Sequence, residues 1–144
     1  MSNWKTKQGL AYENSAVVRL GGVERFIPIL AMRQNKVVVP LMLEVLPIIE
    51  AAGMRKDPET GELVMPPPEV SLRLFSEETL ETMNRIVYVA LTRAYDLTLD
   101  EYLDEPVTVH ELTQAMPAIV KQTGFFRAAE EGRVKAKGED AATS

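Results

Sequence analysis

The sequence predicts a mainly α protein, a small helical bundle with an N-terminal β-hairpin and a disordered C-terminal tail. Apolar residues recur at helical spacing, two Thr-x-x-Glu capping boxes precede helical segments, and a Gly-Gly pair separates two short β-prone runs. At 144 residues the chain fits one domain. We expect a loosely ordered segment over residues 1–15, a single helical domain over residues 16–126, and a mobile tail over residues 127–144.

The hairpin is the first element of the expected domain. Residues 16–20 and 23–27 are rich in β-prone side chains, and Gly21-Gly22 lies between them. Glycine tolerates the positive φ angles of a tight turn, so the pair is a good hairpin signal. An isolated hairpin is only marginally stable in water, and we therefore expect this one to pack on the helices.

A long apolar helix is expected over residues 31–52, with Gly53 suited to a left-handed C-terminal cap. Pro40 and Pro47 fall inside this segment. Each proline removes a backbone donor and disfavours helix in the residue before it. We therefore expect the helix to be kinked or broken, with Pro40 opening its second part.

A long connector over residues 54–75 follows this helix. It contains Pro66-Pro67-Pro68, and consecutive prolines favour extended structure and exclude a helix interior. Loops of this length in a compact domain are commonly functional or disordered. The sequence leaves a variable connector and a docking loop as alternatives.

The next helix begins after Ser76, a suitable N-cap that is followed by two acidic residues. Its apolar positions are Leu80, Met83, Ile86, Val87, Val89, Ala90, Leu91 and Ala94. Together they form an apolar face wide enough to predict a helix that is covered on more than one side.

Two capping boxes predict the last two helices. Thr98 with Glu101 opens a short helix, and Thr108 with Glu111 opens a longer one that ends at Gly124. In a capping box the Thr and Glu side chains each satisfy a backbone donor at the helix start, so both boundaries are well defined.

Composition and charge exclude several classes of function. The formal net charge is −5, which argues against nucleic-acid binding, because that depends on Lys and Arg neutralising phosphates. The chain has no cysteine and hence no disulfide or thiolate metal site. We expect no signal peptide. The most apolar run, residues 37–53, is short and contains Glu44 and two prolines, so we expect it to be buried in the protein and not in a membrane.

No catalytic constellation is apparent. His110 is the single histidine, and no other ligand-type residue lies at a metal-binding spacing around it. The acidic cluster formed by Asp100, Glu101, Asp104 and Glu105 lacks the glycine and the ligand order of a calcium loop. Phosphate-binding glycine loops and nucleophile elbows are also missing. We therefore predict no enzyme, no cofactor and no metal.

Apolar side chains are the remaining candidates for function. The stretch over residues 37–49 is hydrophobic on nearly every side and must be covered all round. The hairpin and the other helices could cover it, or one side could receive a partner helix or another copy of the chain. Phe125-Phe126 form a second candidate contact. The candidate partner-binding residues are Val38, Leu41, Met42, Val45, Ile49, Phe125 and Phe126.

Taken in order, these elements resemble the tail assembly chaperones of long-tailed bacteriophages, over about residues 16–126. The matching phrases are VRLGGVERF (18–26), PILAMRQ (28–34), RIVYVAL (85–91), LTLDEYL (97–103), ELTQAM (111–116) and TGF (123–125). The long connector over residues 54–75 departs from the short one expected in the family.

The resemblance implies a helical protein of the bacterial host cytoplasm, encoded by a phage or prophage. Its implied partners are the tape-measure protein, which it keeps soluble, and the tail tube protein, which it helps to recruit during tail morphogenesis. Homo-oligomers and a longer frameshifted form also occur in the family. The alternative is a structural head–tail connector or tail-completion protein of the virion. A transcription regulator is disfavoured, because the helix after Ser76 carries only Arg85 and Arg93 as basic residues.

Overall fold

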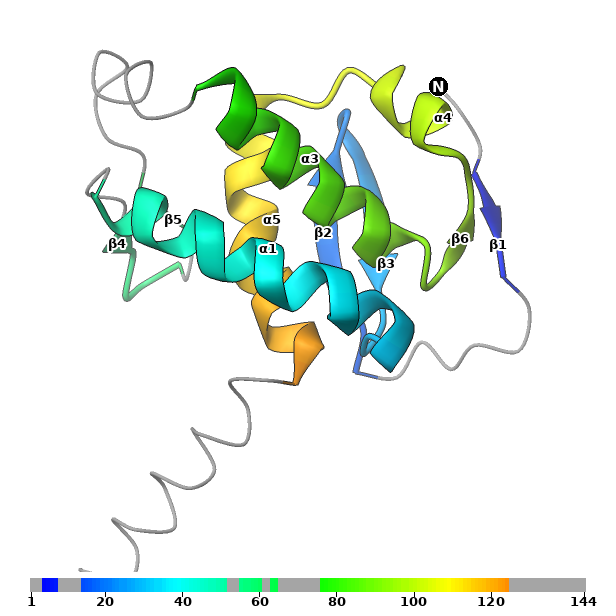
Figure 1. Cartoon of the computed structure of the whole chain (residues 1–144), viewed down its shortest axis with the longest axis horizontal. Helices are drawn as coiled ribbons and strands as arrows, with labels where there is room; N and C mark the ends of the chain where they lie inside the picture. Colours follow the sequence, from blue (N-terminus) through cyan, green and yellow to red (C-terminus); the bar gives the residue numbers. More distant parts are fainter. Residues whose placement is uncertain (1–3, 8–13, 52–54, 61–62, 65–75, 125–144) are drawn as a thin grey trace, which may run out of the picture.

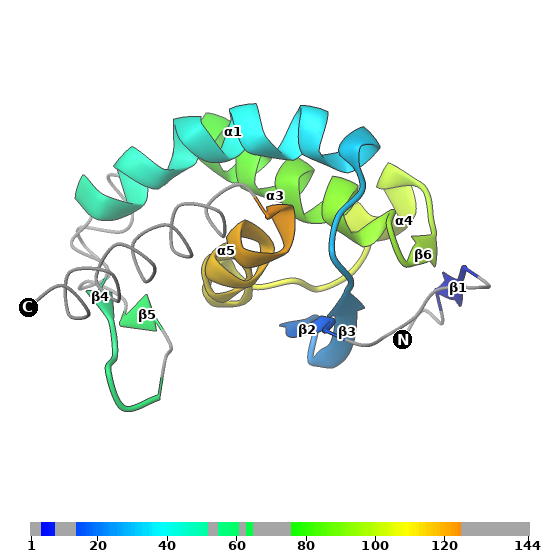
Figure 2. The same cartoon turned by 90° about the horizontal axis from the view of Figure 1, so that it is seen from below.

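The structure, a computed structural model, describes residues 4–7, 14–51, 55–60, 63–64 and 76–124. Its elements are β1 (Lys5–Thr6), β2 (Ala16–Leu20), β3 (Val23–Ile27), α1 (Met32–Ala51), β4 (Arg55–Lys56), β5 (Leu63–Val64), α3 (Glu77–Leu91), β6 (Tyr95–Asp96), α4 (Leu99–Leu103) and α5 (Val109–Thr123). The prediction of a mainly α fold with an N-terminal hairpin is confirmed. Helices α1 and α3 form one layer, and α5 lies with the β2–β3 hairpin in a second layer (Figure 1, Figure 2).

The predicted hairpin is confirmed with the predicted bounds. Strands β2 and β3 pair antiparallel, with Leu20 opposite Val23 across the two-residue turn. Gly21 and Gly22 have φ angles of 62° and 78°, the left-handed conformation that a type I′ turn requires and that glycine adopts most readily. Side chains alternate between the two faces of β2, and Val18 lies on the buried face toward the helices.

The expected break in the long helix is wrong, because α1 runs as a single helix through both prolines. Pro40 and Pro47 cannot donate to the carbonyls of Lys36 and Leu43, four residues earlier. All four residues are exposed, and their spacing places them on one solvent-facing stripe. Water can therefore satisfy the two carbonyls. Gly53, the expected cap, lies outside the described residues.

The core forms where this layer of helices meets α5 and the hairpin. The buried stripe of α1 packs on α3 and α5, and the predicted apolar face of α3 is largely confirmed. The fully buried large side chains are Leu20, Ile27, Val38, Met42, Val45, Met83, Ile86, Val87, Leu91, Tyr102, Met116 and Ile119. Each aliphatic side chain buried in this way contributes about 1.5–3 kcal/mol.

Residues 4–7 correct the expectation of a loosely ordered N-terminal segment. Strand β1 pairs with β6, which lies almost ninety residues later in the chain. Trp4 is only 7% exposed, and its ring makes an edge contact with Tyr95 at a centroid distance of 5.7 Å. The Arg25 guanidinium lies 3.8 Å from the centroid of the Trp4 ring, a cation–π contact. The N-terminal strand is therefore part of the fold.

The C-terminal turn of α5 is hydrogen-bonded to the segments before and after the β2–β3 hairpin. The buried Gln122 side chain donates to the backbone oxygens of Asn14 at 2.8 Å and Ile27 at 2.7 Å. The backbone carbonyl of Gln122 accepts from the Leu30 N–H at 2.9 Å. The helix then ends at Gly124, as predicted, and Gly124 forms a left-handed cap. These contacts fix the hairpin relative to α5.

Both predicted capping boxes are confirmed, and the second also holds the hairpin turn. The Glu111 carboxylate accepts from the backbone N–H of Thr108 at 2.9 Å and from those of Gly21 and Gly22 at 3.0 Å each. Desolvation, the largest single influence, raises the pKa of Glu111. The hydrogen bonds from Thr108, Gly22 and Gly21 together outweigh it and lower this pKa below its usual value of 4.5.

The remaining predictions fall in parts of the chain that the structure describes incompletely. The connector predicted over residues 54–75 contains β4 and β5, which pair antiparallel. Its three consecutive prolines lie outside the described residues, as does the tail predicted over residues 127–144.

Candidate partner-binding surface

The structure places most of the predicted partner-binding residues inside the protein. Four are buried in the core: Val38, Met42, Val45 and Ile49. They form one stripe of α1 that α3 and α5 cover, which corrects the expectation that they are available to a partner. Leu41 is partly buried against the same core. Phe125 and Phe126 lie outside the described residues.

Two exposed apolar side chains lie instead together on α4. Leu99 and Leu103 are 44% and 54% exposed, and their spacing of four residues places them on one face of this short helix. They form a wall of a groove of about 750 Å³ over the outer surface of α3. The groove is lined by Val37, Glu77, Leu80, Glu81, Asn84, Arg85, Tyr88, Val89, Leu99 and Leu103. Figure 1 shows α3 between α1 and α4.

The polar groups in the floor of this groove are already hydrogen-bonded within the protein. Asn84 accepts from the Tyr102 hydroxyl at 2.7 Å and donates to the Leu80 carbonyl at 2.9 Å. Burial raises the pKa of Tyr102 well above its usual range, with a smaller contribution from Glu111, so its hydroxyl remains a donor. The Tyr88 hydroxyl donates to the Leu97 carbonyl at 3.3 Å. The accessible floor therefore offers mainly apolar contact.

The rim of the groove is acidic. Glu77 and Glu81 line it from α3, where Arg85 is the basic residue among the lining side chains. Asp100 of α4 and its C-cap residue Asp104 are exposed, each directly after one of the two exposed leucines. A partner with Lys or Arg beside an apolar stripe would complement this rim.

Other exposed large apolar side chains on the described surface are Val17, Phe26, Ile29, Met32, Leu43 and Val109. Leu43 is 52% exposed on the solvent-facing side of α1 and lines none of the larger hollows described here. Single exposed leucines are normal on protein surfaces, so Leu43 carries no functional argument. It is a useful control for Leu103, because the two are the same residue type with nearly equal exposure.

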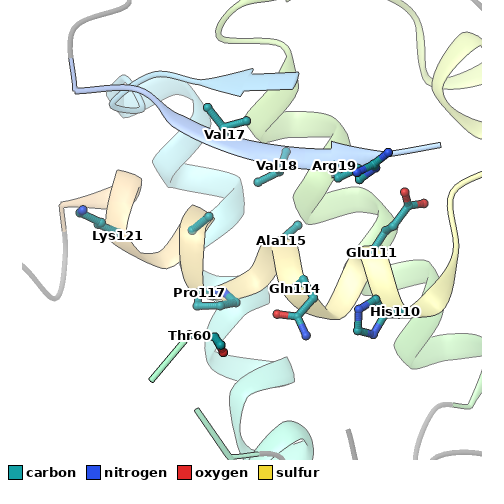
Figure 3. A pocket seen from close by; sticks show the side chains of 11 residues that line it. Val17, Val18, Arg19, Thr60, His110, Glu111, Gln114, Ala115, Pro117 and Lys121 are labelled. Atoms are coloured by element: carbon teal, nitrogen blue, oxygen red, sulfur yellow. The ribbon is translucent and has the colours of Figure 1, made fainter. Parts of the chain in front are cut away.

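A second groove, of about 460 Å³, lies between β2 and α5 (Figure 3). His110 lines it beside Glu111, whose carboxylate is engaged by the hairpin turn. Arg19 and Lys121 are its cationic side chains. Within the described residues, no three His, Cys, Asp or Glu side chains are grouped so that they could hold a metal ion.

Leu99 and Leu103 are the residues that sequence reasoning missed. The available signal was an apolar pair four residues apart on a short helix whose other surface positions are acidic. Among the described helices, none is long and apolar enough to cross a membrane. Comparisons with protein-family models, curated proteins and solved structures gave no match.

Proposed function

We propose that the protein is a phage tail assembly chaperone of the bacterial host cytoplasm, which binds the tape-measure protein, keeps it soluble and helps to recruit tail tube subunits. The observation that carries the proposal is the apolar groove over α3, with Leu99 and Leu103 exposed along its wall. The order of elements that resembles this family adds to it. Both call for a protein that works by reversible contact.

The groove suits an amphipathic helix. Such a helix would place an apolar stripe, with residues three and four apart, against Leu80, Leu99 and Leu103. Basic residues flanking the stripe would meet Glu77 and Glu81 on the rim. A long helical protein with exposed apolar stripes needs this kind of cover before assembly, because such stripes otherwise associate with one another.

A small-molecule ligand is the weaker candidate for the same groove. Ligand pockets usually present a few unsatisfied polar groups that orient the bound molecule. Here the side chains of Asn84 and Tyr88 are engaged with the protein itself. The groove therefore has an apolar floor whose Asn84 and Tyr88 side chains are satisfied within the protein, with charges at its rim, and this arrangement favours a protein surface as its occupant.

Co-expression with the cognate tape-measure protein tests the proposal. The wild-type protein is expected to keep the tape-measure protein in the soluble fraction and to co-purify with it. Leu103→Arg should abolish or strongly reduce both, because it places a cation in the apolar wall. Leu43→Arg is the matched control, since it makes the same change at an equally exposed site away from the groove. Equal loss in both variants, or no effect of wild type, would contradict the proposal.

Mass spectrometry of purified particles distinguishes the alternative. An assembly chaperone is expected to be missing from mature virions, whereas a head–tail connector or tail-completion protein is retained in them. Detection of this chain at a fixed number of copies per particle would replace the chaperone with a structural role.

A further inference from the structure

The two edges of the β2–β3 hairpin differ in how their backbone is satisfied. Leu20 and Val23 close the two-residue turn, so hydrogen-bonded and non-hydrogen-bonded pairs alternate along the ladder from that point. By this register Val17 and Arg19 direct their backbone N–H and C=O groups away from β3. Phe26 of β3 likewise directs its N–H away from β2.

The edge of β3 is covered within the fold. The Phe26 N–H donates to the Tyr95 hydroxyl at 2.9 Å, and Tyr95 is buried beside Trp4. The edge of β2 differs, because no hydrogen bond within the described part of the chain reaches the outward N–H of Val17 or Arg19. Val17 is also 52% exposed. An open strand edge of this kind is a template for a further strand.

This open edge faces a groove that is long enough to hold an extended strand of about five residues. A stripe of α5 runs beside β2 and carries His110, Gln114, Pro117, Ala118 and Lys121 (Figure 3). From residue 110 to residue 121 the helix rises about 16 Å. An extended chain covers that distance in about five residues, the length of β2 itself.

The charged side chains are arranged at the ends of this groove. Arg19 and Glu111 lie together at one end, and Lys121 lies toward the other (Figure 3). Both oxygens of the Glu111 carboxylate are engaged by the N–H groups of Gly21 and Gly22. A bound chain would therefore meet Arg19 and Lys121 as the charges available at the two ends.

We infer that the β2–α5 groove binds an extended acidic segment of a partner protein, which adds a strand to the edge of β2. Backbone bonds to Val17 and Arg19 would provide the pairing, and two carboxylates four residues apart would meet Arg19 and Lys121. This surface is separate from the groove over α3 and does not depend on the partner proposed for it.

A second copy of the chain is the less suitable occupant. Symmetric pairing of two β2 edges would bring two copies of Arg19 and Lys121 close together, and like charges across a strand pair are destabilising. An acidic partner segment would instead relieve the existing positive charge at both ends of the groove.

The test uses the full-length protein and a synthetic nine-residue peptide, blocked at both ends, with alternating Val and Thr and Glu at two positions four residues apart. NMR titration is expected to shift the amide signals of Val17 and Arg19 and to slow their hydrogen exchange. Arg19→Glu and Lys121→Glu should each weaken binding about tenfold or more. Arg33→Glu, an exposed cation that does not line the groove, should leave binding unchanged.

Two further changes separate strand pairing from charge alone. Val17→Pro removes an outward N–H without removing a bond of the hairpin ladder, and it should abolish binding while circular dichroism remains unchanged. N-methylation of alternate peptide bonds in the nine-residue peptide should also abolish binding. Glu24→Gln, opposite Arg19 in the hairpin, should strengthen binding.

Three results would overturn the inference. The first is no binding of the acidic peptide at millimolar concentration. The second is equal binding of a peptide with Lys in place of both Glu residues. The third is concentration-dependent dimerisation, seen by sedimentation, that Val17→Pro abolishes, since this would make a second copy the occupant of the edge.

Discussion

Removal of the Glu111 carboxylate should destabilise the protein more than the loss of an ordinary helix cap. Glu111 is the N3 residue of the capping box of α5, and it also accepts hydrogen bonds from Gly21 and Gly22 at the hairpin turn. Sequence-distant segments therefore meet at this single side chain. Glu111→Ala leaves all three backbone donors without their partner.

The magnitude follows from those three bonds. Loss of a capping interaction costs about 1 kcal/mol. A hydrogen bond to a charged group contributes about 1.5–3 kcal/mol when buried. The N–H of Gly22 is exposed and can bond to water, whereas that of Gly21 is partly buried, so the turn should add about 1–2 kcal/mol. We expect a total loss of about 2–3 kcal/mol in the free energy of unfolding.

Urea unfolding followed by circular dichroism, with linear extrapolation, measures this loss. The matched control is Glu101→Ala in the capping box of α4, which has the same Thr-x-x-Glu geometry. Glu101 is exposed and bonds back to Thr98, so its removal should cost about 0.5–1 kcal/mol. Equal losses in the two variants would refute the argument that Glu111 holds the hairpin against α5.

Three further predictions follow from the same structure. The pKa of Glu111 lies below its usual value, so its carboxylate contributes fully to stability above about pH 5, and this contribution is lost as the pH falls through the folded-state pKa. The difference in unfolding free energy between wild type and Glu111→Gln should therefore be constant from about pH 5 to 8 and should shrink below about pH 4. Pro40→Ala and Pro47→Ala should each raise the free energy of unfolding by about 2 kcal/mol, since each restores a helix donor on the exposed stripe, and the loss of proline's restriction of the unfolded chain offsets only about 1 kcal/mol of the gain; no change would mean that the helix is not continuous there. Trp4→Ala should cost about 3–5 kcal/mol in the same assay, and a loss below about 1 kcal/mol would place Trp4 outside the core.

Local signals in the sequence predicted local structure correctly. The glycine turn of the hairpin, the two capping boxes and the helix end at Gly124 all depend on residues within a few positions of one another. The pairing of β1 with β6 depends on residues far apart, and each strand has only two residues. Such short strands carry no sequence pattern that predicts their pairing.

The partner-binding surface was predicted less well, because hydrophobicity alone does not say which side of a helix faces the core. The run over residues 37–49 is apolar on most sides, and the stripe containing Val38 and Met42 proved to be covered by α3 and α5. The two prolines lie on the opposite, exposed stripe. The accessible groove is assembled from three helices, so Leu99 and Leu103 gain their meaning only from the tertiary arrangement.

The two grooves should bind their partners independently. The groove over α3 and the groove beside β2 share no lining residue, and their charged rims are of opposite sign. Occupation of one therefore adds no contact and removes none at the other. We expect Leu103→Arg to leave the affinity for the acidic peptide unchanged, and saturating peptide to leave co-purification of the helical partner unchanged. Thermodynamic coupling is reciprocal, so if one partner changed the affinity for the other by more than about threefold, the same change would appear in both titrations. Such a change would mean that α5, which packs on α3, transmits binding between the grooves, and the premise of two separate surfaces would then fail.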